Sequence, residues 1–385
     1  MYNPYANVDW DGVQHLISAN HWHCTSKSKF LGICATGIEH LPISNYIPSH
    51  ITYPLTDNEF FAIADGEIPE GLISSPNSEK VTFADASMHV TCPGSTYNSY
   101  GHEWPEEEPK LSWRDKFRNI LDDLQYEDGG GIIINHPVRS GAKVANIIEK
   151  LKFDDRVLGV EVYNHRAHRD YGQKGYFMNE WDTILSKGYR CFGFFTPDEH
   201  NLPSGYTSGD MREVNFGIGR NVLLVPEKTE HEALKAYRNG CFYGAYYGDR
   251  IKFARIEMQG NTFRVETDNA ERIDFISYSL NGFNAVQNPV ATVMSSHGSF
   301  ETDSNTIFVR AIAYEDASSN VTDQPILKEI IFTQAIMLKS TVEISPPHGN
   351  VIDSYVRIDD AWKKISKGYE KRKGNWRKIL NTKAY

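Results

Sequence analysis

The feature that most constrains the fold is an alternation of short apolar runs with longer amphipathic stretches over the first 245 residues. This alternation is typical of βαβ units, in which parallel strands are joined by covering helices. The runs span residues 15–19, 38–43, 71–75, 130–135, 158–164, 191–195 and 221–225, and the clearest amphipathic stretches are 113–125, 144–152, 177–188 and 231–240. Seven runs over this length favour a closed barrel over an open sheet, so we predict an α/β barrel.

The chain changes character after the barrel region. Residues 250–342 alternate apolar and polar residues between Gly, Asn, Asp and Ser, which predicts a small antiparallel β-sandwich. The total of 385 residues also exceeds what a single hydrophobic core usually supports. We therefore expect three domains: a barrel over 1–249, a sandwich of immunoglobulin or fibronectin type over 250–344 and a repeat tail over 345–385.

The tail contains a tandem repeat. The segment from Tyr355 to Ile365 aligns with the segment from Tyr369 to Ile379, each with Tyr, a polar turn, Trp, two basic residues and Ile. This pattern predicts two short β-hairpins that are too small to bury their aromatic residues alone. They pack on the sandwich, on a neighbouring chain, or simply decorate the surface.

Charge and cysteine content exclude several classes of function. The formal net charge of −10 disfavours general binding to nucleic acids or anionic membranes, and no apolar stretch approaches a membrane span. Five scattered cysteines without a CxxC pair indicate reduced core thiols. The polar N-terminus predicts no signal peptide, hence a cytoplasmic protein unless the tail repeat places it in a virion.

Histidines and carboxylates recur at the ends of the strand-like runs. Each of these positions follows or starts an apolar segment: His21 and His23, Glu79, His89, His136, and Asp198 with His200. Catalytic residues of α/β barrels gather at the carboxyl ends of strands, on one face. Imidazole and carboxylate together suit Zn, Mn or Fe. The sequence thus predicts a metal site.

The order of these motifs resembles the PHP (polymerase and histidinol phosphatase) superfamily over about the first 245 residues. The resemblance implies a distorted seven-stranded β/α barrel that hydrolyses phosphoesters with two or three metal ions. It implies the ligands His21, His23, Glu79, His89, His136, Asp198 and His200, with Glu79 bridging two metals. Glu67 and Glu70 stand near Glu79 in the sequence and are alternatives to it.

The sequence departs from the family pattern at two places. Lys29 stands near the position of a further histidine, and Asn45 with Tyr46 replaces an expected Asp-His pair. Asn and Tyr bind a cation more weakly than carboxylate and imidazole do. We therefore expect two divalent ions of Zn, Mn or Fe rather than three, or a site whose chemistry is altered or lost.

The expected reaction is attack of metal-bound hydroxide on phosphorus. Arg139 is the candidate to hold phosphate oxygens, with an exposed loop arginine as the alternative. Either His200 or Tyr46 protonates the leaving group. Glu161 and Asn164 line the same pocket or only finish their strand. His102 is either a lid residue or a solvent-exposed one. Six further histidines are expected to be ordinary polar residues: His40, His50, His165, His168, His231 and His348.

The sequence leaves two functions open. The first is a phosphoesterase acting on a phosphate-containing substrate. The second is a structural or adhesion protein of a phage tail or baseplate with a reduced or inactive site, because the Tyr…Trp repeat of residues 350–385 resembles repeats at the ends of such proteins. The two are compatible if a virion carries the enzyme.

Overall fold

The computed structural model describes most of the chain in two compact units, residues 1–344 and 345–385. The described residues of the first unit are 1–24, 27–45, 69–81, 83–97, 111–200, 218–280, 289–323 and 326–341. Those of the second are the strand segments 355–358, 361–364, 368–372 and 375–380.

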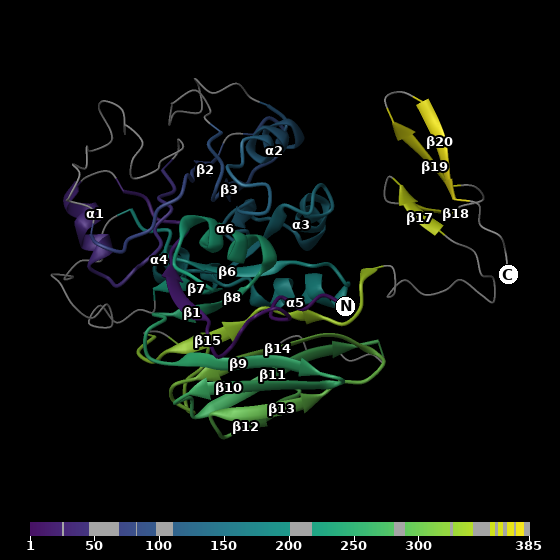
Figure 1. Ribbon diagram of the computed structural model, residues 1–385. Helices are drawn as coiled ribbons and strands as arrows, with labels where there is room; N and C mark the ends of the chain where they lie inside the picture. The colour runs from purple at the N-terminus through teal and green to yellow at the C-terminus, as the bar shows by residue number, and fades with distance from the viewer. Residues whose placement is uncertain are drawn as a thin grey trace. The chain divides into compact units, whose positions relative to one another are not determined.

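A five-stranded sheet of the first unit carries the strand ends at which the site was predicted; its strands β2, β3 and β6 are labelled in Figure 1. Its order is β2 (Glu79–Lys80), β3 (His89–Thr91), β4 (Ile132–Asn135), β5 (Val157–Asn164) and β6 (Phe192–Thr196). The last three strands pair in parallel, and every residue in them is buried. A parallel sheet covered on both faces selects near-continuous apolar runs such as these.

A second sheet has eight strands drawn from both halves of the unit. Its order is β1 (Gln14–Ser18), β7 (Gly219–Val225), β8 (Phe242–Tyr246), β15 (Ile330–Thr333), β14 (Thr306–Tyr314), β11 (Arg272–Ser279) and β12 (Ala291–Val293), with β16 (Ile336–Met337) paired to β14. All of its pairings are antiparallel. The predicted domain boundary between residues 249 and 250 stays a prediction. The sheet contains strands from both sides of this boundary, because β8 pairs with β15.

The predicted seven-stranded barrel is wrong: the described strands form open sheets and no closed barrel. Five of the seven apolar runs become the strands β1, β4, β5, β6 and β7, whereas the runs at 38–43 and 71–75 form only isolated bridges. Among the described strands only β4, β5 and β6 pair in parallel; the others pair antiparallel and do not continue the parallel ladder.

Side-chain amides take the place of a strand partner at the free edge of β6. Asn221 accepts a hydrogen bond from the backbone N–H of Phe195 and donates one to its carbonyl, both at 3.1 Å. Gln334 does the same for Gly193, both at 2.8 Å. Because the edge groups are satisfied in this way, β6 needs no further strand, and the ladder does not close.

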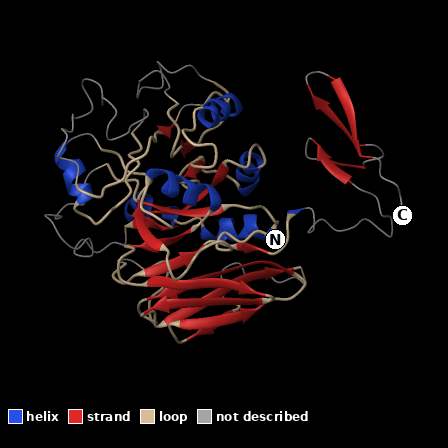
Figure 2. Ribbon diagram, viewed as in Figure 1, coloured by secondary structure: helices blue, strands red, loops and turns tan. Residues whose placement is uncertain are grey.

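Helices cover the five-stranded sheet and the neighbouring strands (Figure 2). They are α1 (Lys27–Cys34), α2 (Trp113–Asp122), α3 (Val144–Leu151), α4 (His165–Tyr171), the 3₁₀ turn η1 (Gly172–Gly175), α5 (Met178–Ser186) and α6 (Glu230–Asn239). Local signals set their ends: Thr229 caps α6 by accepting from the N–H of Glu232, and Gly240 ends it in the left-handed conformation. None of the described helices is long and apolar enough to cross a membrane.

The three strands β9 (Lys252–Gln259), β10 (Thr262–Asp268) and β13 (His297–Glu301) form a separate antiparallel sheet. Its alternating burial follows the alternating sequence, with Phe263 and Val265 inward and Arg264 and Glu266 outward. The inward residues pack with Phe275 of the eight-stranded sheet in one apolar core. The sandwich region is thus joined to the N-terminal strands through a shared sheet.

The second unit contains two hairpins built from the tandem repeat. Strands β17 (Tyr355–Ile358) and β18 (Ala361–Lys364) pair antiparallel, as do β19 (Gly368–Arg372) and β20 (Asn375–Leu380). The registers place Arg357 opposite Trp362 and Lys371 opposite Trp376. Each repeat is therefore one hairpin.

Candidate metal centre

The carboxyl ends of β4, β5 and β6 meet at one edge of the five-stranded sheet. His136 follows β4 directly, Asn164 is the last residue of β5, and Asp198 lies two residues beyond β6. Because these three strands run in parallel, their ends converge there. Asn164 Nδ2 donates to Asp198 Oδ2 at 3.1 Å, which ties two of the ends together.

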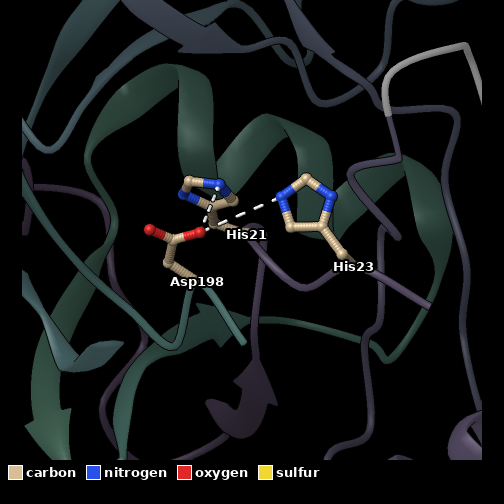
Figure 3. A group of neighbouring side chains, drawn as sticks. All are labelled: His21, His23 and Asp198. Carbon is tan, nitrogen blue, oxygen red and sulfur yellow. Dashed lines mark ion pairs between the residues drawn. The ribbon is translucent and has the colours of Figure 1, made fainter. Parts of the chain in front are cut away.

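The segment of His21 and His23 is held against the end of β6 by backbone hydrogen bonds. The N–H of Asp198 donates to the carbonyl of His21, and the N–H of His23 donates to the carbonyl of Glu199, both at 2.8 Å. A parallel bridge also joins Trp22 to Glu199. As a result, both imidazoles lie beside the Asp198 carboxylate (Figure 3).

Two overlapping groups of buried side chains could each hold a metal ion. One is His21, His23 and Asp198, and the other is His21, Glu79 and His136; within each group the candidate ligand atoms lie within 4.8 Å of one another. His21 is common to both. Glu79 connects the groups, since its Oε1 lies 3.3 Å from His136 Nε2 and its Oε2 lies 3.1 Å from His23 Nε2.

The charges at the centre are strongly coupled. Burial alone would lower the pKa of His21, but the carboxylates of Asp198, Glu161 and Glu79 outweigh it and raise the pKa well above its usual value. Burial would raise the pKa of Glu79, yet His21 above all holds it well below the usual range. The pKa of Asp198 is likewise lowered by His21 and His136 against the effect of burial. The carboxylates are therefore ionised, as metal ligands must be, and His21 would release a proton on binding a metal.

Two of the candidate ligands have backbone conformations that L-residues rarely adopt. His136 has φ of 24° and Asp198 has φ of 50°. Among the described residues only Tyr247 and Asn269 share a positive φ without being glycine. Such conformations persist only where the surroundings hold them, and they cluster at functional sites.

The donor set fits a divalent transition metal. His21 Nε2 is buried and makes no hydrogen bond within the described part of the chain, although Asp198 Oδ1 and Glu79 Oε1 lie 3.3 Å and 3.5 Å away. Two ligand atoms that each lie about 2.0–2.2 Å from one ion are at most about 4.4 Å apart, so these spacings suit atoms that share a cation. Imidazole and carboxylate donors match Zn, Mn and Fe.

Three further predicted residues border the two groups. His89 Nδ1 lies 2.9 Å from Glu79 Oε1, and His200 Nε2 lies 3.8 Å from Asp198 Oδ1. The His200 ring stacks on His23 with 4.0 Å between centroids, and burial followed by the charge of His23 lowers the pKa of His200 to about 3. Arg139 Nη1 is 3.6 Å from Asp198 Oδ2. The roles of all these residues stay predictions, and Tyr46 lies outside the described residues.

Asn45 stands at one of the two departures from the PHP pattern, and its side chain forms hydrogen bonds with the backbone of Cys24. Its side chain accepts from the N–H of Cys24 at 2.9 Å and donates to the carbonyl of Cys24 at 2.7 Å. These bonds fix the backbone just after His23. Lys29, at the other departure, lies in helix α1.

No protein-family model matches this sequence, and no curated protein matches it. A solved structure from Bacteroides vulgatus ATCC 8482, of a two-domain protein containing a predicted PHP-like metal-dependent phosphoesterase, superposes with a TM-score of 0.45. The identity is 12%, over 86% of this chain and 96% of that one.

One residue that contacts the centre was not predicted from the sequence, and the roles of two others were left open. Asn135, which was not predicted as a site residue, donates from Nδ2 to Glu79 Oε1 at 3.2 Å. Glu161 and Asn164 do more than finish their strand, because both contact candidate ligands. The only sequence signal for Asn135 is its position, next to His136 at the end of an apolar run.

The histidines expected to be ordinary polar residues have other partners where they are described. His40 bonds to the hydroxyls of Ser18 and Ser75, both at 2.8 Å, within the core. His231 pairs with Asp128 at 2.7 Å on the surface. His165 lies 3.3 Å from Glu199. His50, His102 and His348 lie outside the described residues.

Proposed function

We propose that this chain is a metal-dependent hydrolase of phosphoester bonds. The observation that carries the proposal is the pair of three-residue groups that share His21, all of them buried and held at converging strand ends. Nε2 of His21 has one lone pair and would bind an ion in one group only, leaving Glu79 and His136 for an adjoining ion. Two adjoining ions suit phosphoester hydrolysis, where charge develops on both the attacking and the leaving oxygen. The expected complement is two divalent ions of Zn, Mn or Fe.

The metal ions, when bound, would polarise a phosphoryl oxygen and lower the pKa of water. The chain itself supplies the arrangement around them. Asp198 presents Oδ1 to the histidines and Oδ2 to Asn164 and Arg139. One carboxylate thus links the ligand groups to an arginine at their margin.

Arg139 is the residue of this site best suited to a phosphate group. Its side chain is 39% exposed, so that a substrate can reach it, whereas Asp198 beside it is buried. A guanidinium binds two phosphate oxygens in a planar fork, which a lysine cannot do. We assign to it the orientation of the substrate, and to His200, whose lowered pKa leaves the ring neutral beside Asp198, a place among the ligands rather than that of an acid.

Metal content and hydrolysis together test this function. The purified protein is analysed for Zn, Mn and Fe, and then assayed with p-nitrophenyl phosphate and bis-p-nitrophenyl phosphate after each metal is restored. Stoichiometric metal with metal-dependent turnover of either ester supports the proposal. A protein that takes up none of the three metals, or that is fully loaded and hydrolyses neither ester, contradicts it.

For the C-terminal repeat we further propose attachment to a larger assembly, such as a phage tail. The support is that both repeats fold as hairpins in a unit of their own. Aromatic residues dominate interface energetics, and the repeats carry Trp362 and Trp376 beside basic residues. A variant ending at Ile344 should bind metal normally but no longer enter the assembly. Unchanged assembly would contradict the proposal.

A further inference from the structure

Glu161 belongs to neither metal-binding group, yet it contacts a member of each. It lies within β5 and is only 1% exposed. Its Oε1 accepts from His21 Nδ1 at 2.5 Å. Its Oε2 accepts from the backbone N–H of His136 at 2.7 Å and from Asn164 Nδ2 at 2.9 Å. Both carboxylate oxygens are therefore committed to site residues.

The contact with His21 determines which ring nitrogen can bind a metal. A neutral imidazole has one N–H and one lone pair, and a hydrogen bond from Nδ1–H to a carboxylate leaves the lone pair on Nε2. Nε2 is the atom that lies 3.3 Å from Asp198 Oδ1 and 3.5 Å from Glu79 Oε1. Glu161 thereby directs the single lone pair of His21 toward Asp198 and Glu79, where it would bind one ion.

The contact with His136 holds an unfavourable backbone. At φ of 24°, His136 needs a partner that keeps its N–H in place. Glu161 Oε2 is that partner, and the resulting conformation brings His136 Nε2 to 3.3 Å from Glu79 Oε1. Without it, the end of β4 is free to relax to an ordinary conformation and carry the imidazole away from Glu79.

We infer that Glu161 is a positioning residue that makes the two metal positions depend on each other. This inference rests on the proposed metal centre. A glutamine at this position has one acceptor oxygen and cannot replace both contacts. If its oxygen faces His136, its NH₂ meets His21 Nδ1, and the hydrogen moves to Nε2, which then cannot bind metal. If its oxygen faces His21, the N–H of His136 loses its acceptor.

The test compares Glu161→Gln with the wild type in two measurements. Calorimetric titration of the metal-free protein with Zn²⁺ should show affinity about 10- to 100-fold lower in the variant. Hydrogen exchange of the His136 amide, measured without metal, should be faster in the variant. The matched control is Glu149→Gln, the same substitution at an exposed carboxylate paired with Arg114 outside the site; its Zn²⁺ affinity should equal that of the wild type.

The outcomes separate this inference from the proposed function. If the wild type binds Zn²⁺ and Glu161→Gln binds it equally well, the positioning role is overturned and the metal centre stands. If the wild type binds no Zn²⁺, both fail together. Should the glutamine variant not fold, Glu161→Asp keeps two oxygens on a shorter side chain and must still bind Zn²⁺ more weakly than the wild type for the inference to hold.

Discussion

Arg310 and Asp182 form a buried ion pair in which two guanidinium nitrogens donate to the two carboxylate oxygens, both at 2.7 Å. Asp182 is 1% exposed and Arg310 is 2% exposed. The pair joins α5 to β14 and so connects residues that are 128 positions apart in the chain. The Arg310 guanidinium also lies 4.7 Å from the ring centre of Trp181.

Removing one partner of this pair should destabilise the protein strongly. We expect Asp182→Asn to lower the free energy of unfolding by about 3–5 kcal/mol, because it leaves the Arg310 charge buried without its counter-ion. Denaturant unfolding measures the loss. As a control, Arg118→Ala breaks an ion pair whose side chains are 58% and 55% exposed and should cost under about 1 kcal/mol. The double variant Asp182→Leu/Arg310→Met should be more stable than Asp182→Asn, since it buries no lone charge.

His136→Ala should reduce metal content and any hydrolysis far more than it reduces stability. The imidazole faces Glu79 at the site and follows its strand rather than packing within it. Elemental analysis and the ester assay give the first two quantities, and unfolding gives the third. His231→Ala, which alters a surface histidine paired with Asp128, serves as the control. Equal metal content in His136→Ala and the wild type would rule out a ligand role for His136.

Adding metal should raise the melting temperature of the metal-free wild type. A ligand that binds only the folded state at 100 times its Kd stabilises by about 2.7 kcal/mol. We expect this gain with Zn²⁺ or Mn²⁺ to disappear in His21→Ala, because His21 belongs to both groups. Differential scanning fluorimetry of the chelator-treated protein measures it. A variant that gains as much as the wild type would show that His21 is not a ligand.

His15 should make the protein less stable as the pH falls below neutrality. Burial, and then the nearby Lys252, lowers the pKa of His15 to about 4 in the folded protein, compared with about 6.5 when unfolded. Above pH ~6.5 the His15 ring is neutral in both the folded and the unfolded state, so it does not change the free energy of unfolding. Between 6.5 and 4 only the unfolded state takes up the proton, and stability is lost; below 4 both states are protonated and no more is lost.

His15→Gln tests this dependence. Between pH 7.5 and 5.5 the variant should lose about 1 kcal/mol less unfolding free energy than the wild type, a value reduced by the partial exposure of the ring. His297→Gln alters an exposed histidine and provides the comparison. Parallel stability curves for His15→Gln and the wild type would contradict the assignment.

The candidate ligands could be found in the sequence because their positions depend on local order. His136 and Asp198 follow apolar runs that became the parallel strands β4 and β6, and parallel strands bring their carboxyl ends to one edge. The two-residue spacing of His21 and His23 likewise places both rings near Asp198. The two hairpins of residues 355–380 could likewise be predicted, because each depends on a local turn.

Strand partners and supporting contacts were decided only by the tertiary structure. Apolar periodicity reports that a run is buried but not which strand it pairs with, so the same runs suited a closed barrel as well as the open sheets that formed. Asn221 and Gln334 end the ladder at β6 from far along the chain. In the sequence, Glu161 is one polar residue within an apolar strand. Its contacts with His21 and His136 form only because the fold brings three distant segments together.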